Sequence, residues 1–99
     1  MRRDDAIRIL REHAEELRRE GVQHVSLFGS VANDNATSDS DVDLIVETLP
    51  ERPLTLFTIG PLHDLFSSLL GRPVDLVDKD GFERAERLKR RAGEIVHVF

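Results

Sequence analysis

The chain has 99 residues, of which 39% are hydrophobic and 33% are charged, and its formal net charge is −5. These values fit one small globular domain over residues 1–99, and they argue against a disordered chain and against non-specific nucleic-acid binding through bulk charge. There is no cysteine, which excludes disulfides, thiolate metal sites and a cysteine nucleophile.

Hydrophobic spacing in the first part of the chain predicts a helix followed by a strand. Over residues 3–20, apolar residues recur every three or four positions, as on one face of a helix, and Gly21 is a typical helix stop. Residues 22–28 (VQHVSLF) then read as a strand that leads into a Gly-Ser pair. The polar stretch 31–41 is expected to be a loop with room for one helical turn.

The rest of the chain alternates strands and helices. In order, the predicted elements are a strand at 42–47, a helix at 61–70, a strand at 73–77, a basic helix at 81–92 and a last short strand at 94–99. The order α-β-β-α-β-α-β predicts an α/β fold in which helices flank a small mixed β-sheet.

Two features bear on the compartment in which the protein works. No apolar run approaches the roughly 20 residues that span a bilayer. The first residues, MRRDDAIRILREH, lack the apolar centre of a signal peptide. We therefore expect a cytoplasmic protein with no membrane partner.

Three aspartates carry the strongest chemical signal. Asp41 and Asp43 flank Val42 at the start of a predicted strand, so their side chains point to one face of the sheet. Adjacent carboxylates repel each other, and a divalent cation offsets the repulsion. Asp75 lies within the apolar strand 73–77, where a charge requires a partner or a metal. If the two strands are neighbours, the three carboxylates meet and can hold two Mg²⁺ ions.

A Gly-Ser pair ends the first predicted strand. Glycine at position 29 lets backbone N–H groups approach a ligand closely. A helical turn that starts at Ser30 directs its free N–H groups and its hydroxyl toward a phosphate, although Ser30 is equally suited to a simple helix cap. Phosphate-binding groups and metal-binding carboxylates on one sheet together indicate phosphoryl or nucleotidyl transfer.

These motifs resemble those of a known family. The Gly-Ser pair, a short polar spacer and Asp41-Val42-Asp43 are similar to the signature of the DNA polymerase β-type nucleotidyltransferase superfamily. The initial helix, FGS, the stretch ATSDSDVDLIV and the later RPVDLV also follow in the order of the minimal nucleotidyltransferase (MNT) domain proteins. The resemblance covers nearly the full length of the chain.

The resemblance implies a Mg²⁺-dependent nucleotidyltransferase that uses ATP. By position, it assigns Gly29 and Ser30 to the triphosphate, Asp41 and Asp43 to metal binding, and Asp75 to the third acidic position, which helps to activate the acceptor hydroxyl. It also implies a helical HEPN-domain toxin as the partner. The protein would then be an antitoxin that transfers AMP from ATP to a tyrosine of that toxin.

One segment departs from the family pattern. Members usually have Ala-Arg-Gly after the Gly-Ser pair, whereas this chain has Ala32-Asn33-Asp34 and so lacks a bidentate phosphate donor. Two alternatives stay open. The protein can be an antitoxin that neutralises the toxin by binding alone, or it can transfer the nucleotide to a small molecule such as an antibiotic, although a short chain leaves little wall for an acceptor pocket.

The other polar residues have simpler interpretations. The four histidines have no metal-type spacing and are interpreted as structural or surface residues. The residues between the Gly-Ser pair and Asp41 are interpreted as turn residues. A basic strip is interpreted first as a solvated helix face and second as a contact with an acidic partner or with nucleotide phosphates; it comprises Arg84, Arg87, Lys89, Arg90 and Arg91.

Overall fold

The computed structural model describes residues 1–99. Its helices are α1 (Arg3–Glu12), α2 (Ala14–Arg19), α3 (Gly29–Ala32), α4 (Ile59–Leu70), α5 (Lys79–Arg84) and α6 (Glu86–Arg91). Its strands are β1 (Val22–Phe28), β2 (Val42–Thr48), β3 (Val74–Asp78) and β4 (Val96–His97). The predicted fold class, a small mixed sheet flanked by helices, is confirmed, and the order of the elements follows the prediction.

The four strands form one sheet in the order β3-β2-β1-β4. β1 runs antiparallel to both β2 and β4, whereas β2 and β3 are parallel neighbours connected through α4. The parallel pairing brings the starts of β2 and β3 to the same end of the sheet. This arrangement decides where the aspartates of the two strands lie.

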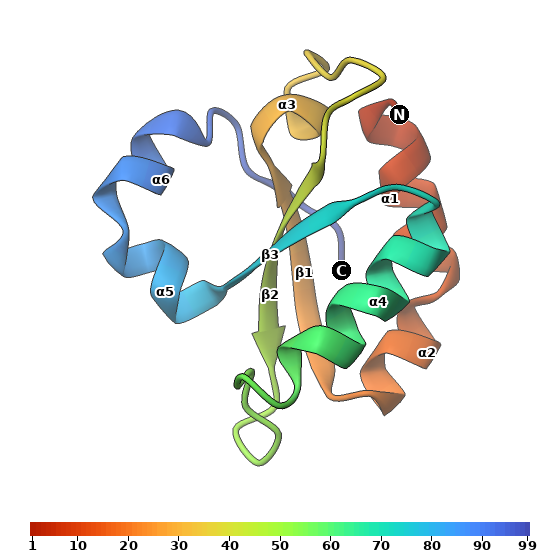
Figure 1. The fold of residues 1–99 in the computed structure, drawn as a ribbon, viewed down its shortest axis with the longest axis vertical. Coiled ribbons are helices and arrows are strands. Elements are labelled where there is room, and N and C mark those ends of the chain that lie inside the picture. The colour runs from red at the N-terminus through yellow and green to blue at the C-terminus, as the bar shows by residue number, and fades with distance from the viewer.

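Helices cover the two faces of the sheet unequally (Figure 1). α1, α2 and α4 pack on one face and form the main core together with alternate residues of the strands. Its fully buried members include Leu10 and Phe66 from the helices and Leu27 and Leu44 from the strands. α5 and α6 lie on the other side, where a small cluster joins Phe28, Ile45, Phe82 and Ala92. The second face is therefore only partly covered, and its polar residues face a cleft rather than a core.

Two predicted helices are each divided in the structure. The helix predicted at 3–20 breaks at His13, whose backbone (φ −108°, ψ 16°) leaves the helical region. Leu10 and Leu17, one on each side of the break, are both fully buried. The basic helix predicted at 81–92 breaks at Ala85 (φ −95°, ψ 86°), so that Phe82 and Leu88 can both pack on the second face.

The last predicted strand is shorter than expected. Val96 and His97 pair with β1 as a regular strand, and the backbones of Val98 and Phe99 are hydrogen-bonded to Val25 of β1, whereas a strand over residues 94–99 is predicted. Before position 96, the backbone N–H of Glu94 donates to the side-chain Oδ1 of Asn33 at 2.9 Å rather than to β1. No helix of the structure is both long enough and apolar enough to cross a membrane.

Candidate active site

Asp43 and Asp75 are neighbours across the parallel strands. They are direct partners in the register of β2 and β3, and Asp43 is also paired with Phe28 on the β1 side. The residues that flank Asp43, Val42 and Leu44, are fully buried on the core face. Alternation along the strand therefore directs the carboxylates of Asp43 and Asp75 to the second face, as the sequence predicts.

Gly29 lies against Asp43 at the end of β1. Its φ is +72°, and a Cβ atom at this position would collide with the carboxylate of Asp43. The backbone N–H of Gly29 donates to the carbonyl oxygen of Ala92 at 3.0 Å, so this N–H group is already paired within the protein. Glycine is thus required for space and for backbone conformation beside the carboxylate.

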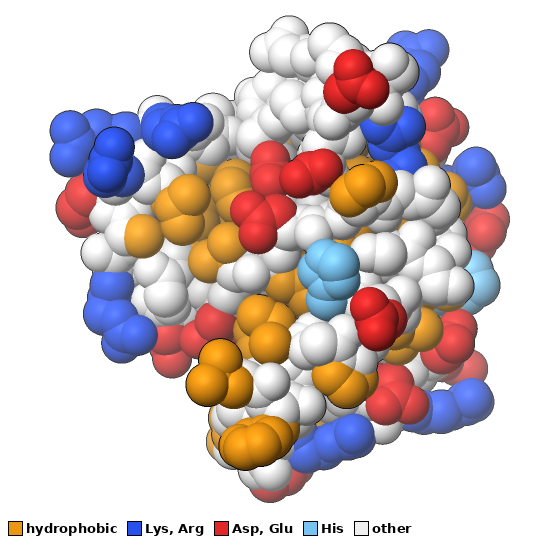
Figure 2. Space-filling model, viewed as in Figure 1, with side chains coloured by type: hydrophobic (Ala, Val, Ile, Leu, Met, Phe, Trp, Pro, Cys, Tyr) orange, Lys and Arg blue, Asp and Glu red, His pale blue; other side chains and the backbone are white.

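A pocket of about 390 Å³ lies where these elements meet. Its walls contain Phe28, Gly29, Ser30, Asp43, Asp75, Leu88 and Arg91. Figure 2 shows acidic side chains grouped near the middle of this view, close to the start of β2, with basic side chains over α6 to their upper left. Four of the five residues predicted for the site, Gly29, Ser30, Asp43 and Asp75, therefore line one pocket.

Asp41 is placed next to the pocket rather than in its wall. It precedes the first residue of β2 and is exposed. The loop that leads to it is held by Arg72, whose Nη2 donates to the carbonyl oxygen of Ser40 at 3.1 Å. The negative charge of Asp41 still contributes to the raised pKa of Asp43, after burial and the charge of Asp75.

The pKa of Asp43 is raised from 3.8 to about 6. Burial of the carboxyl group is the largest cause, followed by the negative charge of Asp75 and then that of Asp41. Both effects disfavour the ionised form. The three aspartates are therefore coupled electrostatically, and a cation at this point would relieve the repulsion between them.

The donor chemistry of the pocket fits a magnesium ion. Asp43 and Asp75 supply the carboxylate oxygens that Mg²⁺ prefers, and Mg²⁺ in proteins is commonly held by one or two carboxylates together with substrate phosphates and water. No group of three or more His, Cys, Asp or Glu side chains is arranged to hold a metal ion. Of the three predicted carboxylates, Asp43 and Asp75 line the pocket and Asp41 precedes β2 beside it.

Asn33 and Asp34 both turn away from the pocket. The Nδ2 of Asn33 donates to the carbonyl oxygens of Gly29 and Ala92, at 2.7 and 3.1 Å. Asp34 has φ +55°, and its carboxylate accepts a hydrogen bond from the backbone N–H of Arg3 at 3.2 Å. The negative charge of Asp34 is therefore directed to α1 and does not oppose an anion in the pocket.

Replacing Asp43 by Asn is expected to stabilise the protein above about pH 6. The pKa of Asp43 in the folded state is above its unfolded value. Its contribution to the free energy of unfolding is therefore fully present below about pH 4 and is lost as the pH rises through 6. Without solvent screening, the pKa shift would correspond to about 3 kcal/mol of unfolding free energy. Because the carboxyl group is partly exposed to solvent, we expect a gain of about 1–2 kcal/mol for the Asn variant.

Urea unfolding at about pH 4 and about pH 8, without divalent cations, measures this effect. Asp39→Asn is the matched control, because Asp39 is an exposed turn residue. If the unfolding free energies of Asp43→Asn and the wild type differ by the same amount at both pH values, the raised pKa of Asp43 is contradicted.

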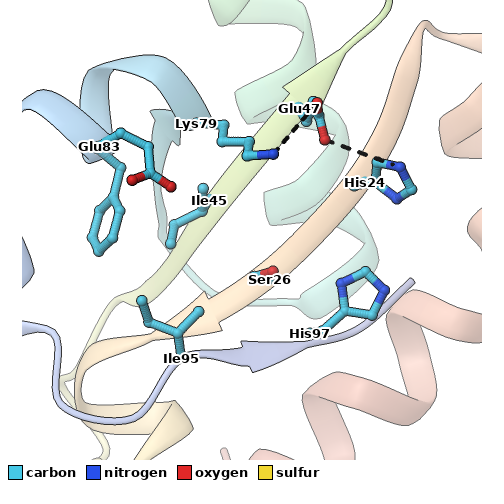
Figure 3. A pocket seen from close by; sticks show the side chains of 9 residues that line it. His24, Ser26, Ile45, Glu47, Lys79, Glu83, Ile95 and His97 are labelled. Carbon is cyan, nitrogen blue, oxygen red and sulfur yellow. Dashed lines mark ion pairs between the residues drawn. The ribbon is translucent and has the colours of Figure 1, made fainter.

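A second pocket of about 350 Å³ lies on the same face of the sheet, farther along β1 and β2 (Figure 3). Glu47 forms ion pairs there with Lys79 at 3.7 Å and with the Nε2 of His24 at 4.0 Å. The ring centroids of His24 and His97 are 5.9 Å apart. Two histidines that are distant in sequence thus come together, but they form no metal-binding group.

Three residues of the first pocket, Phe28, Leu88 and Arg91, were not predicted as site residues. Leu88 and Arg91 reach it from α6. The signal available in the sequence was the basic strip, which was interpreted first as a solvated face. Its second interpretation, contact with nucleotide phosphates, concerned the whole strip, and nothing in the sequence distinguished Arg91 from its neighbours.

The fold is that of the small α/β nucleotidyltransferase domains. The sequence model of the Nucleotidyltransferase domain family matches residues 10–97, and the chain belongs to that family. Protein adenylyltransferase MntA of Thermococcus cleftensis is 42% identical over 91 residues, which cover 91% of this chain and 89% of that protein.

Solved structures share the fold. A protein described as a minimal nucleotidyltransferase has a TM-score of 0.68 and 36% identity, covering 93% of this chain and 90% of the other. A chain from the complex of the tri-AMPylated Shewanella oneidensis HEPN toxin with its MNT antitoxin has a TM-score of 0.61 and 22% identity, covering 92% of this chain and 69% of that one. The second likeness concerns the fold alone.

Proposed function

We propose that residues 1–99 form a single domain that transfers AMP from ATP to a tyrosine hydroxyl of a HEPN-domain toxin, and that the protein thereby acts as an antitoxin in the cytoplasm. The observation that carries the proposal is the pairing of Asp43 with Asp75 beside Gly29 and Ser30 in one pocket. The 42% identity to a protein adenylyltransferase supports the choice of AMP and of a protein acceptor.

Each residue has a defined task in this reaction. The Asp43 and Asp75 carboxylates, with Asp41 beside them, would hold Mg²⁺, which when bound offsets phosphate charge and stabilises the transition state. The Ser30 hydroxyl, in the wall of the pocket, would donate a hydrogen bond to a phosphate oxygen. A carboxylate oxygen of Asp75 accepts the proton of the acceptor hydroxyl. The hydroxyl oxygen then bonds to the α-phosphorus of ATP, and pyrophosphate leaves.

The shape of the site favours an acceptor that arrives from outside. A volume of about 390 Å³ is at the lower end of the range for small-molecule sites, so phosphates and ribose would occupy most of it. Asp75 is on the edge strand β3 and is exposed. A tyrosine on the surface of a partner can reach an exposed carboxylate at an edge, which supports a protein acceptor over an antibiotic.

Transfer of labelled AMP tests the proposal. The purified protein, the HEPN-domain partner, Mg²⁺ and ATP labelled at the α-phosphate are expected to yield labelled partner, and EDTA is expected to abolish the label. A partner in which the acceptor tyrosine is replaced by phenylalanine is the control for site-specific transfer. Absence of label with either Mg²⁺ or Mn²⁺ would rule out the enzymatic function.

Neutralisation of the toxin by binding alone is the second candidate. It is favoured by one observation, the commitment of Asn33 to hydrogen bonds within the protein rather than to a ligand. The Asp41→Asn, Asp43→Asn double variant separates the two candidates in a toxin-rescue assay. A folded double variant that binds the toxin but no longer neutralises it excludes a purely steric mode.

A further inference from the structure

Arg91 is the only cationic residue in the wall of the candidate active site. The other polar side chains of the pocket are Ser30 and the carboxylates of Asp43 and Asp75. A triphosphate brings several negative charges to a site that already contains two carboxylates. A cation supplied by the protein is therefore valuable there, in addition to any metal ion.

The guanidinium group of Arg91 has no partner within the protein. It takes part in no hydrogen bond or ion pair, whereas its neighbour Lys89 is paired with Glu86 at 3.7 Å. Arg91 is exposed, yet it closes one side of the pocket opposite the strands. A planar guanidinium group can donate two parallel hydrogen bonds to a phosphate, which makes arginine well suited to this position.

The backbone next to Arg91 is fixed to the Gly-Ser turn. The carbonyl oxygen of Ala92 accepts hydrogen bonds from the backbone N–H of Gly29 at 3.0 Å and from the Nδ2 of Asn33 at 3.1 Å. Ala92 is 1% exposed and packs in the cluster with Phe28. The Oδ1 of Asn33 also holds the backbone N–H of Glu94. Asn33 therefore fastens the end of α6 to the turn that carries Ser30.

From this arrangement we infer that Arg91 binds the phosphates of the nucleotide and that Asn33 is the positioning residue that holds it over the pocket. The inference rests on the proposed function, because it takes the ligand of the pocket to be a nucleoside triphosphate. Within the basic strip, the inference assigns phosphate binding to Arg91 and not to its neighbour Arg90, because Arg90 is not part of the pocket wall.

Calorimetric titration of the full chain with AMP-PNP and Mg²⁺ tests the role of Arg91. Arg91→Ala is expected to weaken binding about 10- to 100-fold, as for loss of a hydrogen-bonded charge pair. Arg91→Lys should retain part of the affinity because the charge remains. Arg90→Ala, the matched control, should bind as the wild type does. Equal affinities for Arg91→Ala and the wild type would overturn the inference.

A double-variant cycle tests the role of Asn33. If Asn33 acts through Arg91, Asn33→Ala weakens AMP-PNP binding in the wild type but has no further effect in an Arg91→Ala background. If the role of Asn33 is purely structural, Asn33→Ala weakens binding in both backgrounds, and that result would overturn the assignment of Asn33 as the positioning residue. Protein that binds AMP-PNP through Arg91 but never transfers AMP would refute the proposed function and leave the inference standing.

Discussion

Asp43→Asn and Asp75→Asn are each expected to lower the rate of AMP transfer by about 10²- to 10⁴-fold, the range for loss of a charge-stabilising or proton-accepting group. The two carboxylates are paired in register on adjacent strands and line one pocket. Asparagine preserves the shape of each side chain but removes the negative charge that binds a metal ion or accepts a proton. Initial rates of label transfer to the partner protein measure the effect.

Stability separates this prediction from simple loss of folding. Asp43→Asn is expected to make the protein more stable near neutral pH, because the pKa of Asp43 is raised by burial and by the two neighbouring carboxylates. Activity and stability should therefore change in opposite directions. Asp39→Asn serves as the control for both measurements. Near-wild-type transfer by Asp43→Asn or by Asp75→Asn would remove that residue from the catalytic assignment.

Gly29→Ala is expected to destabilise the protein by about 2–5 kcal/mol. The estimate combines about 1–2 kcal/mol for a non-glycine residue in the left-handed region with about 1–3 kcal/mol for overpacking. At Gly29 the added Cβ atom would meet the carboxylate of Asp43, whose backbone is fixed in β2. Displacement of that carboxylate should also lower AMP transfer.

Substitutions at two other glycines separate the backbone cost from the cost of the contact with Asp43 in the loss of stability. Gly71 also has a positive φ, +65°, but a Cβ atom there has nothing within 4 Å, so Gly71→Ala reports the backbone cost alone. Gly60 lies in α4 with an ordinary φ and open space, so Gly60→Ala should be neutral or stabilising by up to about 1 kcal/mol. Thermal unfolding of the three variants measures the series. A Gly29→Ala protein no less stable than Gly71→Ala would show that the contact with Asp43 is not tight.

Local patterns were sufficient to predict most of the elements. Alternation along 42–47 placed Asp41 and Asp43 on one side of a strand with Val42 on the other, and in the structure Val42 lies in the main core whereas Asp43 lines the pocket on the second face. Gly21 marked the end of the first predicted helix, and its φ is positive in the structure. These are properties of residues close in sequence, so spacing and side-chain chemistry were enough to find them.

Features that depend on strand order were predicted only on a condition or were not predicted. The meeting of Asp75 with Asp43 required β3 to lie beside β2, which the sequence allowed but did not establish. The proximity of His24 and His97 depends on the antiparallel pairing of β1 and β4, and no spacing rule reveals it. The special position of Arg91 follows from hydrogen bonds between residues far apart in the chain, at 29, 33 and 92.

Intact-mass spectrometry of the HEPN-domain partner after co-expression tests the central claim most directly. Co-expression with the wild-type chain should increase the mass of the partner by one or more AMP units, and co-expression with the Asp43→Asn variant should leave the mass unchanged. A partner that is neutralised in cells by the wild-type chain but carries no added AMP would contradict the account, and the pocket at Asp43 and Asp75 would then have to serve another purpose.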